Sequence, residues 1–379
     1  MLINELPDDC LLTIFYHLKD LQDLINCYKV CEKWCNLIVG RTKRVKYLIN
    51  QSCYSPDYVC NHVKRPVGAT CLSTLFPNLR IAYFSSLLFE KVPIKDIFKV
   101  IRDSKYLKGI MIDTDFGFEL MPEIANFEML SIGYVNPNIS GIYENVKQLH
   151  LRCSNLYLFE LVHYFPNLER LKFYKEPESS EPYYDAPVLA NLKILEMERP
   201  HVYWEDAWCS FVFMDLCPAL QSAHIRISCF PIDVNDSIKL ANLQDLVIEF
   251  YDSIEWNDLQ RQMSKYPNLK HLAIRATYLQ HVREENIKEL ILILPKLTLL
   301  DVRKSYGITQ EGADHIRNYC KQHGRSIKFY FNKDDEQIKS DWPQLLNHPF
   351  KICRGFDFME NCFFKSFDDL PYFLDPIDD

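Results

Sequence analysis

The sequence predicts an α/β protein in which a short helical module precedes a long array of strand-turn-helix units. Two observations predict this class. Apolar residues between positions 11 and 37 recur at helical spacing, and a Pro-Asn-Leu-x-x-Leu-x-Leu phrase then returns at intervals that are mostly 22 to 28 residues long. Such units stack their strands into a parallel sheet on the concave side of a curved solenoid, with helices outside. We therefore divide the chain into a helical domain (1–40), a connecting segment with a first atypical repeat (41–75), the solenoid (76–331) and an acidic, aromatic cap and tail (332–379).

Composition limits the functions that this chain can serve. Of 379 residues, 48% are hydrophobic and 25% are charged, which is typical of a globular protein. The formal net charge of -8 argues against a general surface for nucleic acid or anionic membranes. We see no signal peptide and no apolar run long enough to span a bilayer, and the 14 cysteines lack paired C-x-x-C elements. These features predict a chain of the cytosol or nucleus that uses no cofactor or metal and binds neither nucleic acid nor membrane.

The helical module begins at a Leu-Pro-Asp-Asp sequence. Proline suits the first turn of a helix, and the carboxylates of Asp8 and Asp9 favour its positive end. We expect a helix over residues 8–18 and a second start near residues 20–23, giving two or three short helices. A bundle this small cannot bury all its apolar side chains, so it should offer an apolar face to a partner.

The residues of this module resemble the F-box. The matching positions include Leu6-Pro7, Ile14-Phe15 and Lys33-Trp34, and the main departure is Asp9, where the family usually has Glu. The resemblance covers about 35 residues and implies binding to the small Skp adaptor, and through it to cullin and RING subunits. We expect adaptor contact, or shaping of the helices that make it, from Leu6, Pro7, Leu11, Leu12, Ile14, Phe15, Leu18, Leu24, Val30, Cys31, Trp34 and Leu37.

Two other interpretations of the first 60 residues stay open. The helices would also serve as a cap that covers the apolar end of the array. Cys27, Cys31 and Cys35 lie on one helix face, and Cys53, Cys60 and His62 are closely spaced, but neither set has the spacing of an ordinary zinc site. We expect packing roles for these cysteines. Arg41, Lys43, Arg44 and Lys46 fit a solvated helix end better than a nuclear-import patch.

The repeat array shows period-two alternation in each strand phrase and helical spacing between strands. Phrases such as FPNLERLKFY and YPNLKHLAIR place apolar residues at positions one, four and six, and residues 258–266 and 285–294 have helical patterns. The interval of 17 residues between Met129 and Val146 is unusually short. The array resembles irregular leucine-rich repeats, and with the helical module the chain resembles the F-box/leucine-rich-repeat family, whose members select proteins for ubiquitin transfer and proteasomal degradation.

Positions three, five and seven of each phrase should face the concave surface. Charges there change sign from strand to strand, which favours cross-strand pairing on a solvated face over a single anion site. The most basic block is the first candidate for contacting an acidic or phosphorylated segment of a substrate. We assign tentative substrate contacts to His150, Arg152, Arg170, Lys172, Tyr174, His224 and Arg226.

Two segments interrupt the repeat pattern. Residues 175–187 are rich in Glu, Ser, Tyr and Pro and predict an exposed excursion that is a second candidate for partner contact. From Lys333 onward there are 11 acidic and 5 basic residues, together with seven Phe and Trp342. The first part should cap the last repeat, and the acidic end, residues 367–379, should fold back along the basic parts of the concave face and limit or shape substrate access.

No nucleotide-binding, metalloprotease or nucleophile motif is present, so the sequence predicts a non-catalytic protein. The fold and the resemblance together predict a substrate receptor of a Skp-cullin-F-box ligase. Two alternatives remain: a repeat scaffold without a role in ubiquitin ligation, and a small-ligand sensor like some plant members of the family. The alternating charges argue against the converging basic pocket that such a sensor needs.

Overall fold

The computed structural model separates the chain into two compact units, residues 1–146 and 147–379. The described residues are 3–50, 55–61, 72–113, 126–133, 141–152, 162–174, 188–198, 210–227, 234–250, 255–276, 283–303, 308–331, 334–343 and 351–377.

The first unit begins with the helical module and continues into a small parallel sheet. A 3-10 turn (Ile3–Glu5) precedes α1 (Asp8–Tyr16), α2 (Leu21–Tyr28) and α3 (Glu32–Thr42), which confirms the prediction of two or three short helices. The strands run in the order β5-β4-β3-β1-β2. They are β1 (Tyr47–Ile49), β2 (Tyr58–Cys60), β3 (Ile81–Phe84), β4 (Gly109–Ile112) and β5 (Met129–Ile132), accompanied by α4 (Leu72–Leu75), α5 (Ser86–Lys91) and α6 (Ile94–Asp103).

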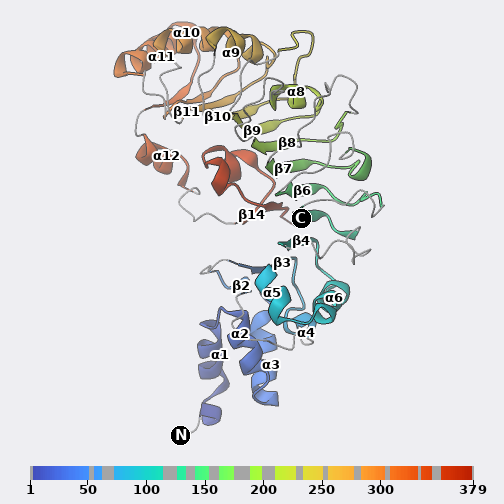
Figure 1. The fold of residues 1–379 in the computed structure, drawn as a ribbon. Helices are drawn as coiled ribbons and strands as arrows, with labels where there is room; N and C mark the ends of the chain where they lie inside the picture. The colour runs from blue at the N-terminus through green and yellow to red at the C-terminus, as the bar shows by residue number, and fades with distance from the viewer. Residues whose placement is uncertain are drawn as a thin grey trace. The chain divides into compact units, whose positions relative to one another are not determined.

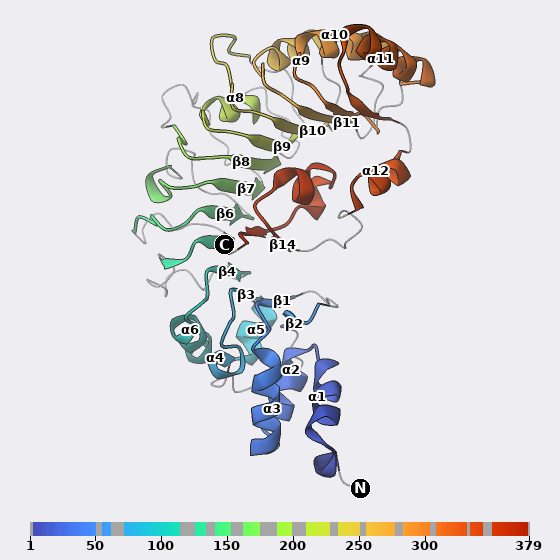
Figure 2. The same cartoon turned by 180° about the vertical axis from the view of Figure 1, so that it is seen from behind.

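The second unit is a parallel sheet whose strands pair in chain order from β6 to β13. Helices α8 to α11 lie on one side of it, and the C-terminal segment lies on the other (Figures 1 and 2). The strands are β6 (Gln148–Leu151), β7 (Arg170–Tyr174), β8 (Ile194–Glu198), β9 (Ser222–Ile227), β10 (Asp245–Phe250), β11 (His271–Ala276), β12 (Leu299–Asp301) and β13 (Lys328–Tyr330). The helices are α8 (Ser210–Asp215), α9 (Trp256–Met263), α10 (Glu284–Ile293) and α11 (Gln310–His323).

The predicted repeat pattern is confirmed in this unit. The fourth-position residues Leu171, Leu195 and Ala223 are register partners on neighbouring strands and are fully buried, as are their counterparts on β10 to β12. The helices predicted at 258–266 and 285–294 are α9 and α10. Helix α9 ends at Met263, before the predicted residue 266. Pro267 explains the early end, because the residue before a proline disfavours helical backbone. The mixed α/β, solenoid-like class is therefore correct.

Asparagine side chains join successive turns. The amide of Asn268 donates to Ala241 O at 2.6 Å, and that of Asn242 donates to Pro218 O at 2.9 Å. Each bond gives a donor to a backbone carbonyl that lies in the turn before the preceding strand and has no partner within the sheet.

Removing one such hydrogen bond should lower the stability of the fold by a small but measurable amount. We expect Asn268→Ala to lower the free energy of unfolding by about 1 kcal/mol, because a turn carbonyl loses its donor. Urea denaturation checks this value, with Asn318→Ala on the exposed side of α11 as the control. Equal stability of Asn268→Ala and the wild type would show that the asparagine ladder contributes nothing.

The C-terminal segment of the second unit forms its own small structure, which we call the tail (residues 351–377). Helix α12 (Asp335–Asp341) precedes it. The tail contains the parallel pair β14 (Ile352–Arg354) and β15 (Phe373–Asp375), a π-helical turn (Met359–Phe363) and a 3-10 turn (Phe367–Asp369). Gly355 leaves β14 with φ of 90°, a conformation that favours glycine, while its N–H bonds Asp375 O.

Candidate protein-binding sites

The helical module of the first unit is held by a compact aromatic and aliphatic core. The rings of Phe15 and Trp34 meet edge to face with centroids 5.0 Å apart. Lys33 donates to Leu6 O at 3.2 Å and pairs with Asp8 at 3.1 Å, so α3 holds the Leu-Pro start against α1. Arg41 donates to Leu18 O at 2.6 Å and fixes the end of α1.

The twelve predicted adaptor residues divide into three groups by exposure. Four of them, Leu11, Phe15, Leu24 and Trp34, are buried and build the module. The side chains of Ile14 and Val30 remain 40% and 53% exposed. Pro7 is also exposed, and the remaining five are half-buried, namely Leu6, Leu12, Leu18, Cys31 and Leu37. Sequence reasoning did not include Ile3 and Tyr16, which add exposed apolar surface.

The second candidate site is the face of the second unit's sheet that carries positions three, five and seven. We call it the tail face. Its charged side chains alternate across the strands: Arg170 of β7 pairs with Glu196 of β8 at 2.6 Å, and Arg226 of β9 pairs with Glu249 of β10 at 2.8 Å. Arg275 of β11 pairs in the same way with Asp301 of β12 at 3.3 Å. The predicted cross-strand pairing is confirmed.

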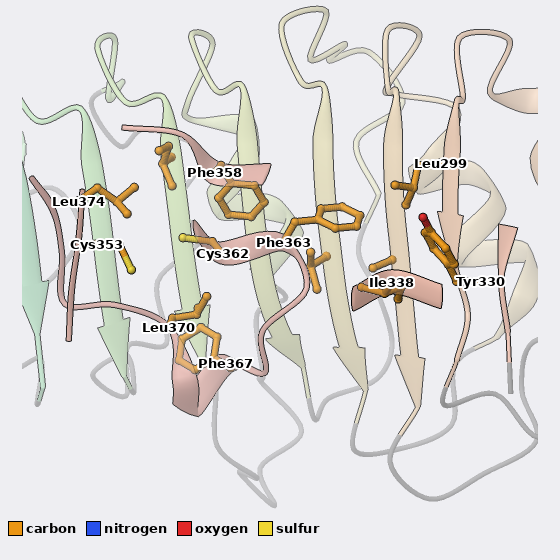
Figure 3. Packing of buried hydrophobic residues seen from close by; sticks show 13 residues of the cluster. Leu299, Tyr330, Ile338, Cys353, Phe358, Cys362, Phe363, Phe367, Leu370 and Leu374 are labelled. Carbon is orange, nitrogen blue, oxygen red and sulfur yellow. The ribbon is translucent and has the colours of Figure 1, made fainter. Parts of the chain in front are cut away.

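The expectation of a solvated face is wrong, because the tail covers these charges. The side chains of Arg170 and Lys172 are each 1% exposed, and Glu196 is 0% exposed. Apolar residues lie among them at the same register positions, including Ile194, Val247, Ala273 and Leu299. Figure 3 shows tail side chains such as Phe363, Phe367 and Leu374 directed at the strands, where they form one buried cluster with those residues.

The hydrogen bonds between the tail and the sheet are mainly to backbone carbonyls of the tail. Arg170 donates to Pro371 O at 2.7 Å and to Tyr372 O at 3.1 Å, and Lys172 donates to Leu370 O at 2.8 Å. Gln148 bonds both the N–H and the C=O of Leu374. The prediction that the acidic end lies along the basic parts of this face is thus confirmed for residues 367–375.

A bidentate ion pair joins the carboxylate of Asp368 in the tail to the sheet. Both oxygens of Asp368 accept from Arg226, each at 3.0 Å. The neighbouring Asp369 is exposed and bonds Ser366 instead. The expected attraction between the acidic tail and the basic face is therefore seen at Asp368, while tail carbonyls accept from Arg170, Lys172 and Arg275.

Burial changes the protonation of the basic groups on this face. Burial lowers the pKa of Lys172 to about 8, although the carboxylate of Glu196 opposes the shift. Burial, followed by the charges of Lys172 and Arg170, also holds the pKa of His150 well below its usual value. The His150 imidazole is accordingly neutral and stacks on Tyr372, with ring centroids 4.5 Å apart.

The lowered pKa of Lys172 predicts a pH dependence of stability. Because its folded-state pKa lies below the ordinary 10.5, the unfolded chain holds more protons between about pH 8 and 10.5, and stability rises with pH in that window. We expect the stability of the wild type relative to Lys172→Met to increase between pH 7 and pH 10. Chemical denaturation at several pH values measures this difference, and Lys288→Met at an exposed position is the control. A difference independent of pH would contradict the shift.

The seven tentative substrate residues all lie toward the tail. His150, Arg170, Lys172, His224 and Arg226 are buried, and Arg152 and Tyr174 are half-buried. His224 and Tyr174 meet the ring of Phe367, and Arg152 lies close enough to Lys351 to lower the pKa of that amine, after burial. Substrate contact by these seven residues stays a prediction, and it requires the tail to move.

Sequence reasoning missed two groups on the tail face. Gln148 occupies the same register position as Arg170 and was not considered, and Arg275 was not included among the site residues although it donates to Phe363 O and Lys365 O. A signal for the covering of this face was available in the sequence. Apolar residues at Val247, Ala273 and Leu299, on a face predicted to meet water, require something apolar to cover them.

Several other predictions concern metals, membranes and connecting segments. Among the described residues, no group of three or more His, Cys, Asp or Glu side chains is placed to hold a metal ion. No helix in the described part of the chain is long and apolar enough to cross a membrane. Cys53, His62 and the excursion at 175–187 lie outside the described residues.

Comparison with known families identifies the helical module. Residues 3–42 match the model of the F-box-like family. No curated protein sequence matches the chain. F-box domains in general bind the Skp adaptor, and proteins that carry them are typically non-catalytic adaptors. The helices α1 to α3, with the apolar surface around Ile14 and Val30, are therefore an F-box-like domain, which points to an adaptor-binding protein.

Proposed function

We propose that this chain is the substrate-recognition subunit of a Skp-cullin-F-box ubiquitin ligase. The observation that carries the proposal is the F-box-like domain with its exposed apolar side chains, since a soluble helical module leaves such residues at its surface when a partner covers them. The F-box-like domain would dock on the Skp adaptor, and cullin and RING subunits would join through that adaptor. The protein would act in the cytosol or nucleus.

We further infer that the units of the sheet are irregular leucine-rich repeats. Their support is the recurring Pro-Asn-Leu phrase and the parallel strands with helices on one side. In this role the chain performs no chemistry. It raises the effective concentration of a substrate lysine near the charged ubiquitin-transfer enzyme, which is sufficient for large rate gains.

Isolation of the tagged full chain from cells tests this proposal. We expect cullin and RING subunits to accompany the wild type and to be lost with Ile14→Asp, because a charge replaces an exposed apolar contact. Thr13→Asp, an equal change at a polar exposed position of the same helix, should retain them. Cullin recovery that is unaffected by Ile14→Asp would contradict the proposed docking surface.

One alternative has support from a specific observation. The tail buries the sheet face that was expected to contact substrate, which favours a scaffold whose partners bind elsewhere and are not ubiquitylated. Such a scaffold predicts that no cullin accompanies the isolated chain, even where the Skp adaptor does.

A further inference from the structure

Residues 366–375 lie across strands β9 to β6 as a bound peptide would. Asp368 contacts β9 through Arg226, Leu370 to Tyr372 contact β7 through Arg170 and Lys172, and Leu374 contacts β6 through Gln148. Adjacent parallel strands are about 4.8 Å apart and an extended chain advances about 3.3 Å per residue, so seven fully extended residues would overreach the three steps between strands. Residues 367–369 shorten the path because they form the 3-10 turn, after which Leu370 is extended and β15 follows at Phe373–Asp375.

The main-chain contacts of this segment do not depend on its amino-acid sequence. Arg170, Lys172 and Gln148 bind carbonyl oxygens, and Gln148 also accepts from a backbone N–H. Any extended peptide presents the same groups at the same intervals. The sheet therefore provides a generic set of donors, as surfaces that bind peptides in extended form do.

Side-chain contacts supply the selectivity. The ring of Phe367 is fully buried against Tyr174 and His224, with the cations of Lys172 and Arg226 5.6 and 5.2 Å from its centroid. Asp368 makes the bidentate pair with Arg226, a geometry that strengthens and orients a carboxylate contact. Leu370 and Leu374 fill the apolar cluster. Asp368 and Asp369 are both exposed, but Asp369 bonds Ser366 and not Arg226.

The preceding part of the tail has contacts of its own with the sheet. Arg275 holds Phe363 O and Lys365 O, and Phe358, Cys362 and Phe363 pack in the buried cluster. Residues 366–377 can therefore leave the sheet by rotation near Ser366 while the π-helical turn stays in place. Their departure breaks the β14–β15 pairing and uncovers the donors of β6, β7 and β9 together.

We propose that the tail face of β6 to β9 is a peptide-binding groove that residues 366–377 occupy as a resident competitor. The occupant that it takes in exchange is an extended segment of a partner protein with the same chemistry: an aromatic residue followed by an acidic one, then Leu-Pro-aromatic. Identifying this partner as the ligase substrate rests on the proposed function, but the groove itself does not. Because the tail is tethered, a partner competes against an effective concentration on the order of millimolar.

Fluorescence anisotropy with a labelled peptide of residues 366–377 tests the groove. The protein is the full chain as wild type, as Asp368→Ala and as Asp369→Ala. We expect Asp368→Ala to bind the peptide at least tenfold more tightly than the wild type, because its own tail has lost the bidentate contact and competes less well. Asp369→Ala, an identical change at a residue that does not contact the sheet, should match the wild type.

The peptide itself provides the specificity test. A labelled peptide carrying Asp368→Ala should bind the Asp368→Ala chain at least tenfold more weakly than the natural peptide does. In a chain that also carries Arg226→Gln, the two peptides should bind equally. Equal binding of both peptides to a chain with Arg226 intact would overturn the proposed recognition of an acidic residue.

Other outcomes would refute the groove. Absence of saturable binding to a folded Asp368→Ala chain would mean that the tail is a permanent part of the sheet. If that variant does not fold, the wild type is incubated with millimolar photo-crosslinking peptide, and absence of labelling on β6 to β9 would refute the groove equally. A concentration-dependent dimer of Asp368→Ala would identify a second copy as the occupant, contrary to the proposal. Adaptor binding is measured on the same samples, so its loss counts against the proposed function and leaves the peptide result standing.

Discussion

Replacing Phe367 with alanine is expected to lower the free energy of unfolding of the second unit by about 3–5 kcal/mol, the usual cost of deleting a buried aromatic ring. The ring is fully buried, and it meets Tyr174 and His224 at centroid distances of 5.4 and 5.6 Å. Its removal leaves a cavity between the tail and the sheet and takes away the aromatic partner of Lys172 and Arg226. Chemical denaturation measures the loss.

Limited proteolysis shows where the Phe367 variant opens. Cleavage should accelerate within residues 351–377, since local opening precedes cutting. The control is Phe329→Ala on β13, whose half-buried ring stacks on Phe331 and does not belong to the tail cluster. A Phe367→Ala chain that matches this control in both stability and cleavage would show that the tail is not held by its aromatic contacts.

Arg170→Met is expected to have a similarly large effect, about 3–5 kcal/mol, because it leaves a buried carboxylate without its cation. Glu196 is 0% exposed and accepts from Arg170 at 2.6 Å. The same guanidinium also serves Pro371 O and Tyr372 O, so two tail carbonyls lose their donor. Thermal and urea denaturation of the full chain give the cost.

A second substitution and a control isolate the electrostatic part of that cost. Adding Glu196→Met to Arg170→Met should recover a large share of the stability, since the unpaired charge is removed with its partner. The matched control is Lys193→Met, which breaks the pair with Glu169. These two residues directly precede β8 and β7, and both side chains are partly exposed. We expect a loss of at most about 1 kcal/mol there. Equal losses at Arg170 and Lys193 would contradict the importance of burial.

The strand-turn-helix architecture was predictable because each phrase shows the alternation of apolar residues that a half-buried strand requires. Successive phrases place apolar residues at the same positions one, four and six, and these residues are buried. Examples are Leu168, Leu171 and Phe173 in one phrase and Leu192, Leu195 and Met197 in the next. Helix ends were less certain. The first helix was predicted to reach residue 18 and ends at Tyr16, because apolar spacing continues past the last helical hydrogen bond.

The tail could be predicted in outline but not in its contacts. Its charge and seven phenylalanines indicated that it packs back on the chain, yet they suggested that acidic side chains would meet basic ones. In the structure most of the cations bind backbone carbonyls, which every sequence has and no pattern reveals. The covering of the face was signalled instead by Val247, Ala273 and Leu299, apolar residues at positions that otherwise alternate in charge.

The exposure of the F-box-like residues also depended on tertiary structure. Leu11 and Ile14 belong to the same apolar stripe of α1, which packs against α3, but Leu11 is buried and Ile14 is exposed. Helical periodicity cannot separate them, because a short bundle has too few residues to bury a whole stripe. Only the packing of three helices decides which side chains remain for a partner.

We propose that residues 3–42 bind the Skp adaptor. Co-expression of the full chain with that adaptor, followed by light scattering of the purified sample, measures it most directly. We predict a stable complex with the mass of one copy of each, which is lost when residues 1–40 are deleted and also with Ile14→Asp in the intact chain. A wild-type chain that elutes alone, or a complex that survives both changes, would contradict adaptor binding through the F-box-like domain.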